Sequence, residues 1–129
     1  MELNLAHDIE GRKEITVTAD KTAIAFCSGT LEVFATPSMI ALMEQTAMES
    51  VADLLPEGFT TVGFEVCVRH LKATFVGDVV TINSKLIESD NRKLVFEVAA
   101  NDKTGLIGKG THTRYIVNKQ MFIDNLKDK

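Results

Sequence analysis

Several features that mark common protein classes are missing from this sequence. No stretch reaches the roughly 18 uninterrupted apolar residues of a membrane span, and residues 1–10 lack the basic start and apolar run of a secretory signal. The 14 Lys and Arg residues are outnumbered by 18 Asp and Glu residues and cluster only as pairs such as Arg12-Lys13. These absences predict a cytoplasmic protein that binds neither membranes nor nucleic acid.

Cysteine is scarce, and its two copies are not placed for cross-linking or metal binding. Cys27 and Cys67 lie far apart in apolar segments, and neither belongs to a C-x-x-C pair or to a Cys/His cluster with metal spacing. We therefore expect two reduced, buried thiols and no metal site. The motifs G-x-x-x-x-G-K-[ST], G-x-G-x-x-G, H-E-x-x-H and G-x-S-x-G are also absent, so nucleotide hydrolases, dinucleotide enzymes and serine hydrolases lose their usual signatures.

What the sequence does contain is enough apolar material for one core. Apolar residues make up 45% of the 129 residues, so the chain can fold without disulfides or a structural metal. No shift in composition marks a linker, and we expect residues 1–129 to form a single domain.

Apolar periodicity predicts a strand, a long helix and then more strands. Ile15 and Val17 alternate with threonines in an opening strand over residues 14–19. A helix is predicted over residues 37–55, with Thr36 as its N-cap and Pro37 as its first helical residue. Its broad apolar side comprises Ile40, Met43, Ala47, Met48, Val51 and Leu55.

Four further strands are predicted over residues 61–74, 79–88, 94–100 and 106–117, followed by a short helical tail. In the first of them Val62, Phe64, Val66, Val68 and His70 are expected to share one face. This order indicates an α+β fold in which an antiparallel sheet wraps around one long central helix. A single helix cannot cover two sheet faces and a long sheet edge invites pairing, so we expect a symmetric dimer.

Glu44 is the most informative polar residue of the predicted helix. Its helical neighbours are Ile40, Ala41, Ala47 and Met48, none of which can pair with a carboxylate. A carboxyl group removed from water and from cations can serve as a general base near neutral pH. The alternative is a structural carboxylate held by hydrogen bonds or facing a dimer interface.

His70 and Thr36 each have a structural explanation as well as a functional one. His70 continues an apolar strand face, where histidines are commonly core or interface residues. Thr36 is explained first as a helix cap, and Ser38 offers a second hydroxyl nearby. A helix start nevertheless directs free N–H groups outward, which suits a developing oxyanion.

The last strand adds a cation on a face of small residues. His112 and Arg114 share parity with Gly108 and Gly110, so this face leaves room for a ligand. Arg114 is expected either to form an ion pair with an acidic surface residue or to meet the phosphates of a nucleotide-like carrier.

Two segments resemble a known family. They read V-F-A-T-P-S-M-I-A-L-M-E-Q-T-A (Val33 to Ala47) and T-V-G-F-E-V-C-V-R-H-L-K-A-T-F-V-G-D (Thr61 to Asp78), and they resemble the hotdog thioesterases related to fluoroacetyl-CoA thioesterase. In that family a threonine at the helix start, a glutamate eight residues later and a histidine in the following strand form the catalytic group. These positions match Thr36, Glu44 and His70.

The resemblance implies a hotdog-fold acyl-CoA thioesterase that needs no cofactor beyond the CoA of its substrate. Gly63 matches a family glycine beside the substrate and Arg114 a family arginine near the site, so they join Ser38 as expected substrate-binding residues. The resemblance also implies a homodimer, or a dimer of dimers, with joined sheets and sites near the subunit interface. Phe75 departs from the family, in which many relatives carry proline at this position.

Two other functions remain open on the same scaffold. One carboxylate and one histidine could add water to an enoyl-CoA, in which case no thiol is released. Alternatively, the pocket could hold acyl-CoA without reacting, as in a binding or sensor protein, because function belongs to the site and not to the fold.

Overall fold

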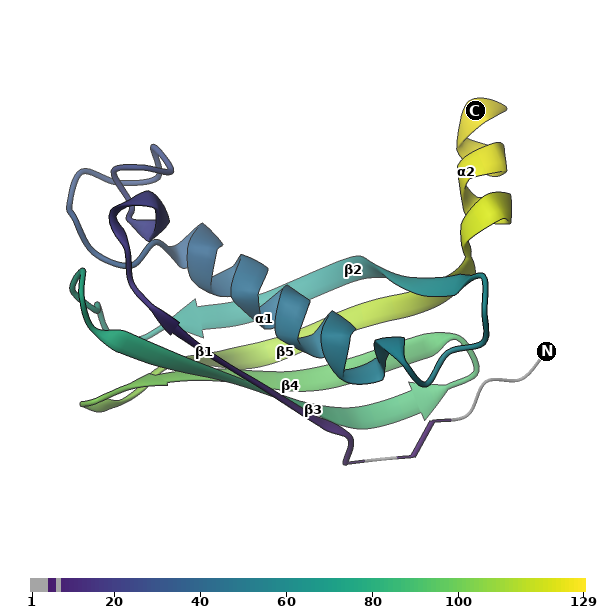
Figure 1. Ribbon diagram of the computed structural model, residues 1–129, viewed down its shortest axis with the longest axis horizontal. Helices are drawn as coiled ribbons and strands as arrows, with labels where there is room; N and C mark the ends of the chain where they lie inside the picture. The colour runs from purple at the N-terminus through teal and green to yellow at the C-terminus, as the bar shows by residue number, and fades with distance from the viewer. Residues whose placement is uncertain (1–4, 7) are drawn as a thin grey trace.

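The computed structural model describes residues 5–6 and 8–129, so residues 1–4 and 7 of the expected domain lie outside the description. The elements are β1 (Glu10–Thr16), a 3₁₀ turn (Ala19–Lys21), α1 (Thr36–Ala52), β2 (Phe59–His70), β3 (Val79–Asp90), β4 (Lys93–Asp102), β5 (Gly105–Asn118) and α2 (Lys119–Lys127). The five strands form one antiparallel sheet in the order β1-β3-β4-β5-β2. The predicted α+β arrangement is confirmed, since α1 lies across one face of the curved sheet (Figure 1).

The core lies between α1 and the sheet. Met39, Met43, Ala47 and Val51 follow one another at intervals of four residues and are at most 1% exposed. They pack against apolar side chains of β3, β4 and β5, among which Phe96 is fully buried. The predicted apolar side is confirmed at Met43, Ala47 and Val51, whereas Ile40 and Met48 are only half-buried. The helix ends at Ala52, so Leu55 packs against the core from beyond its end.

The start of α1 differs from the prediction. The N-cap is Ala35, which makes no side-chain cap bond, and Thr36 is already helical, so Pro37 occupies the second helical position. The threonine hydroxyl is engaged elsewhere, as described below. Thr36 as N-cap was therefore wrong, although the helix does begin where its residue pattern indicated.

A β-bulge in β2 changes which side chains share a face. The pairing with β5 slips between Gly63 and Glu65, so Phe64 is an extra residue in the strand. Gly63 pairs with Arg114, and His70 pairs with Gly108, which lies on the same face of β5 as Arg114. The predicted single face from Val62 to His70 was wrong, and the bulge brings Gly63 onto the α1 side together with His70.

The two edges of the sheet have different chemistry. β1 carries several charged residues in the sequence E-G-R-K-E-I-T, which protects an edge against further pairing. β2 is a 12-residue edge strand rich in valine, with Phe64 68% exposed. Cys67 lies on this edge strand, and both Cys67 and Cys27 are exposed free thiols, so the expectation of buried cysteines was wrong.

The described helices do not resemble membrane spans. Within residues 5–6 and 8–129, neither helix is both long enough and apolar enough to cross a bilayer. The predicted helical tail is confirmed as α2, which projects from the end of β5 away from the sheet (Figure 1).

Candidate active site

A hydroxyl and an imidazole meet at the start of α1. Thr36 Oγ1 lies 2.8 Å from His70 Nδ1, which joins the first helical residue to the last residue of β2. The ring of His70 also lies edge-to-face against Phe34, with 6.3 Å between ring centroids. The imidazole is thereby fixed from two sides while the threonine hydroxyl remains exposed to solvent.

His70 is held as a neutral base. Burial lowers the pKa of its imidazole below the usual 6.5. Within the described part of the chain the buried Nε2 has no hydrogen-bond partner, while Nδ1 contacts the Thr36 hydroxyl. A neutral ring next to a hydroxyl group is the arrangement in which an imidazole can accept or return a proton near neutral pH.

The helix start offers free backbone donors at the same place. Ala35 donates its N–H to the Lys21 carbonyl at 2.9 Å, and Pro37 has no N–H. The N–H groups of Thr36 and Ser38 remain without intrahelical acceptors, as the first turn of any helix requires. Together with the positive end of the helix dipole, these N–H groups favour negative charge.

A small pocket opens at this point of the surface. Its volume is about 270 Å³, and Thr36 and His70 contribute to its wall. The remaining lining residues are Ala23, Ser28, Val33, Phe34, Leu71, Lys72 and Ala73. Ser38 is buried at 4% exposure and does not line the pocket, although it belongs to the first turn of α1.

Glu44 lies in a second cluster, farther along α1. Its Oε1 is 3.0 Å from the point that a Cβ atom on Gly63 would occupy, and Arg114 Nη1 is 3.4 Å from the same point. The carboxylate and the guanidinium thus border one small space that the glycine leaves empty. The helical neighbours of Glu44 in the sequence include no cation, but Arg114 reaches it from β5, on the opposite side of the core.

Arg114 is more deeply buried than the sequence indicated. At 8% exposure it donates from Nε to Thr61 Oγ1 at 2.8 Å and from Nη2 to the Thr61 carbonyl at 3.0 Å. None of the ion pairs among the described residues includes Arg114. The expected surface ion pair was therefore wrong, and a buried guanidinium is also poorly placed for the phosphates of a large carrier.

The structure does not bring all three predicted catalytic residues together within one chain. Thr36 and His70 are in contact, but Glu44 is eight helical residues from Thr36, a separation of about 12 Å along the helix axis. Glu44 instead shares its surroundings with Gly63 and Arg114. One chain therefore carries two half-sites, a Thr36–His70 half and a Glu44–Gly63–Arg114 half.

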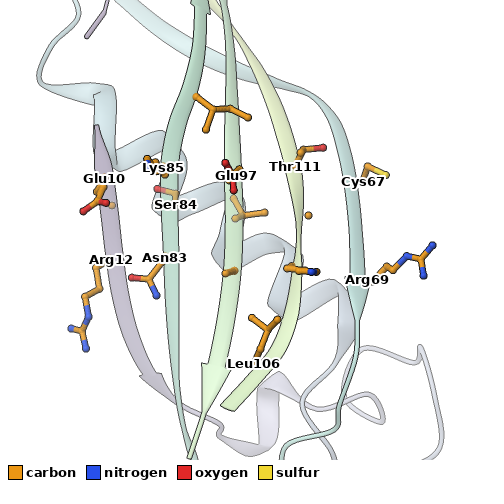
Figure 2. Close-up of a pocket in the computed structure, with 16 residues that line it drawn as sticks. Glu10, Arg12, Cys67, Arg69, Asn83, Ser84, Lys85, Glu97, Leu106 and Thr111 are labelled. Carbon is orange, nitrogen blue, oxygen red and sulfur yellow. The ribbon is translucent and has the colours of Figure 1, made fainter. Parts of the chain in front are cut away.

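A larger hollow lies on the other face of the sheet. Its volume is about 900 Å³, and it is bordered by charges of both signs, including Arg12, Lys85 and Glu97. Figure 2 shows these side chains standing on the strand face turned away from α1. None of the predicted site residues lines it, so its size does not make it the reactive site.

Sequence reasoning missed the role of one buried residue, His112. It is 1% exposed. Its Nδ1 lies 2.8 Å from the Glu65 carbonyl oxygen, and its Nε2 lies 3.2 Å from Arg114 Nη1. Since a carbonyl can only accept, Nδ1 is the donor. The parity of His112 with Arg114 was visible in the sequence, but the 3.2 Å contact between the two side chains was not.

Comparison with known proteins gives a consistent result. Residues 17–120, more than half of the chain, match the family described as Fluoroacetyl-CoA-specific thioesterase. The chain is 36% identical over 98 residues to the fluoroacetyl-CoA thioesterase of Streptantibioticus cattleyicolor, which covers 76% of this chain and 70% of that protein.

Solved structures agree with the sequence comparison. A structure of the fluoroacetyl-CoA thioesterase FlK has a TM-score of 0.91 at 29% identity, covering 98% of each chain. A variant of that enzyme in complex with fluoroacetate and CoA has a TM-score of 0.84 at 30% identity, covering 92% of this chain and 99% of the other. A thioesterase superfamily member from Thermus thermophilus has a TM-score of 0.87 at 25% identity, covering 97% and 95% of the two chains.

Proposed function

The chain belongs to the family of fluoroacetyl-CoA-specific thioesterases and is an acyl-CoA thioesterase, and from this premise we propose that Thr36, Glu44 and His70 carry its reaction. The observation that supports the roles of Thr36 and His70 is the 2.8 Å contact between Thr36 Oγ1 and His70 Nδ1 at the open start of α1, and the position of Glu44 beside Gly63 and Arg114 supports its role. A hydroxyl, a neutral imidazole and free helix N–H groups can together orient a thioester and stabilise its oxyanion.

We further propose that the complete site forms between two subunits. Glu44 lies about 12 Å from Thr36 along its own helix, so a second copy has to supply the missing half. β2 offers the surface for this, since it is the apolar edge of the sheet and β1 is the charged one. Pairing of β2 with its symmetric copy would continue the sheet across the dimer.

One register of this pairing joins the two half-sites. Residues directly opposite each other in an antiparallel pair point to the same face. If the twofold axis passes at Cys67, the extra residue Phe64 bulges out and Gly63 lies opposite the partner subunit's His70. Glu44 borders the space at Gly63, so this register places its carboxylate beside the partner's Thr36–His70 pair.

In the proposed reaction the thioester carbonyl lies at the helix start, near the N–H groups of Thr36 and Ser38. Glu44 takes a proton from water, the water oxygen bonds to the carbonyl carbon, and the C–S bond breaks. The proton then goes to the departing CoA thiolate through His70 and Thr36. Direct attack by the Glu44 carboxylate is the alternative, and an acyl adduct on the Glu44 peptide after rapid quenching would show it.

We assign the remaining residues to substrate binding. Gly63 keeps open the space beside Glu44, Arg114 directs donors into that space, and Ser38 contributes its N–H at the helix start. The pocket of about 270 Å³ favours a short acyl group. We also propose a cytoplasmic location, which suits two free, exposed thiols because the cytosol keeps thiols reduced.

The test of the mechanism is thiol release from a panel of short, branched, aromatic and long acyl-CoAs. Glu44→Ala should lower kcat/KM by at least about 100-fold on the substrate that reacts best, because it removes the base. Glu49→Ala is the matched control, since Glu49 lies on the same helix and forms an ion pair with Lys13 at the surface. Wild-type turnover in Glu44→Ala would overturn the mechanism.

The same panel separates the two other functions. Loss of the enoyl double bond without thiol release would indicate a hydratase. Saturable binding of acyl-CoA without any product would indicate a binding protein, and the thioesterase assignment would then fail for this chain.

The dimer register has its own test. With the axis at Cys67, the two Cys67 side chains face each other across the interface, so mild oxidation in vitro should give a disulfide-linked dimer. The link should persist in Cys27→Ser and vanish in Cys67→Ser. A dimer that never links through Cys67 would contradict this register and with it the shared site.

A further inference from the structure

We propose that His112 is a positioning residue, a neutral imidazole that holds the Arg114 guanidinium in place beside Glu44. This inference rests on the proposed role of Glu44 and adds a residue that acts through Arg114, while its Cε1 lies 3.6 Å from the point that a Cβ atom on Gly63 would occupy. His112 is 1% exposed and accounts for one of the three hydrogen bonds that Arg114 makes. A histidine buried so deeply between a cation and a carbonyl needs an explanation beyond filling space.

The hydrogen bonds fix which nitrogen of His112 carries the proton. Nδ1 donates to the Glu65 carbonyl at 2.8 Å, so Nε2 keeps its lone pair and accepts from Arg114 Nη1 at 3.2 Å. Burial lowers the pKa of His112, which keeps the ring neutral near pH 7. A protonated ring would lose the acceptor and would place a second positive charge against the guanidinium.

Each strand and helix around His112 contributes a different group. Glu44 faces it from α1 and Arg114 from β5. The positive charge of Arg114 lowers the pKa of His112, and the negative charge of Glu44 raises it. Phe96 of β4 stacks on the ring with 6.4 Å between centroids. β2 offers the carbonyl of Glu65, which lies at the bulge. The ring is thus held by stacking and by two hydrogen bonds of opposite direction.

The contact with His112 determines the direction in which Arg114 points its Nη1 N–H groups. A guanidinium has five N–H groups in a planar fork, of which Thr61 takes two and His112 one. Of the remaining two, one belongs to Nη1, which lies 3.4 Å from the Cβ position at Gly63 and so borders the space where Glu44 Oε1 also lies. Thr61 holds the Nε and Nη2 side of the fork, so His112 alone holds Nη1, the nitrogen nearest this space.

Two substitutions separate the two hydrogen bonds of His112. In His112→Asn the amide N–H can replace Nδ1–H toward Glu65, but Arg114 loses its acceptor. In His112→Gln the amide oxygen can replace Nε2 toward Arg114, but the bond to Glu65 is lost. Thermal unfolding of both variants comes first, so that kinetics are measured well below each transition.

The expected result is an asymmetry in turnover. His112→Asn should lower kcat by about 10-fold with little change in KM, because a misaimed group costs most in the transition state. His112→Gln should stay within about threefold of wild type. His112→Asn combined with Arg114→Lys should be no slower than Arg114→Lys alone, since the two residues act as one unit.

The pH profile gives an independent readout. With both His70 and His112 required in neutral form, the acid-side slope of log kcat/KM should be steeper by up to one in the wild type than in His112→Gln, since Glu44 and His70 act in both proteins. Equal kcat losses in the Asn and Gln variants, or an unchanged acid slope, would reduce His112 to a structural residue. Such a result leaves the role of Glu44 as the base intact. Wild-type activity in Glu44→Ala would instead contradict both the mechanism and the positioning role of His112.

Discussion

Gly63→Ala offers the sharpest test of the space between Glu44 and Arg114. A Cβ atom at this position would lie 3.0 Å from Glu44 Oε1, closer than ordinary van der Waals contact, and 3.4 Å from Arg114 Nη1. The carboxylate ends a flexible side chain, so it can move aside by a few tenths of an ångström. Gly63 is not among the residues with positive φ, so alanine adds no backbone strain and the fold should survive.

The magnitude follows from the displacement. A shift of about 1 Å in a reacting group can cost about 100-fold in rate, so a few tenths should cost roughly 10-fold, or about 1.4 kcal/mol in the activation free energy. We expect that loss in kcat/KM for thiol release, together with a change in unfolding free energy of less than about 1 kcal/mol. Val62→Ala, at the neighbouring position on the opposite sheet face, is the control. Wild-type kcat/KM in Gly63→Ala would refute the idea that this space is part of the reactive site.

Three further outcomes follow from the site geometry. Thr36→Val removes the hydroxyl that contacts His70 and should lower kcat/KM by about 10- to 100-fold with little change in Tm, measured by thiol release and thermal unfolding. Arg114→Lys leaves the oxygens of Thr61 without the donor fork and should lower the free energy of unfolding in urea by about 1–3 kcal/mol. Burial lowers the folded-state pKa of His70 and His112 below 6.5, so the stability they contribute is complete above pH 6.5 and is lost as the pH falls through the lowered values. Urea unfolding at pH 7.5 and 5.5 should show this loss, and it should be smaller in His112→Asn.

The periodicity of the sequence was sufficient to predict the elements of the fold. A helix of apolar residues followed by four alternating runs predicted α1 and the strands β2 to β5. The observed ends of these elements differ from the predicted ends by only a few residues. The apolar side of the helix was assigned less well. Met39 is fully buried while Ile40 is not, because the direction of a helix face depends on where the sheet curves, and a 3.6-residue period does not contain that information.

The site was predictable only where sequence neighbours or a family resemblance pointed to it. The contact between Thr36 and His70 spans 34 residues, and no local pattern links the two. The surroundings of Glu44 were misjudged for a related reason. Its helical neighbours are apolar, but Arg114 reaches the same space from β5, and a contact across the core is invisible to arguments about residues three or four positions apart.

The exposed thiols show the same limit at the sheet edge. Cys67 stands among valines in the sequence, which favours a buried strand, but its side chain lies on the sheet face turned away from α1, in one row with the exposed Thr111 and Glu97. The face that a strand residue takes depends on long-range pairing and on the bulge, so the burial of Cys67 cannot be inferred from composition. If β2 pairs with a second copy, the apolar composition of this strand has a reason that the single chain does not show.

The bulge at Phe64 links the edge strand to the chemistry. In a regular strand, positions seven residues apart point to opposite faces, so Gly63 and His70 could not both face α1. The extra residue reverses the parity between them, and both do face α1. The same reversal is what allows Gly63 of one subunit to lie opposite the partner subunit's His70 with both on the helix side. A strand without the bulge could still pair with its copy, but Gly63 and His70 would then face opposite sides of the sheet, so the opening beside Glu44 would not lie opposite the partner subunit's His70.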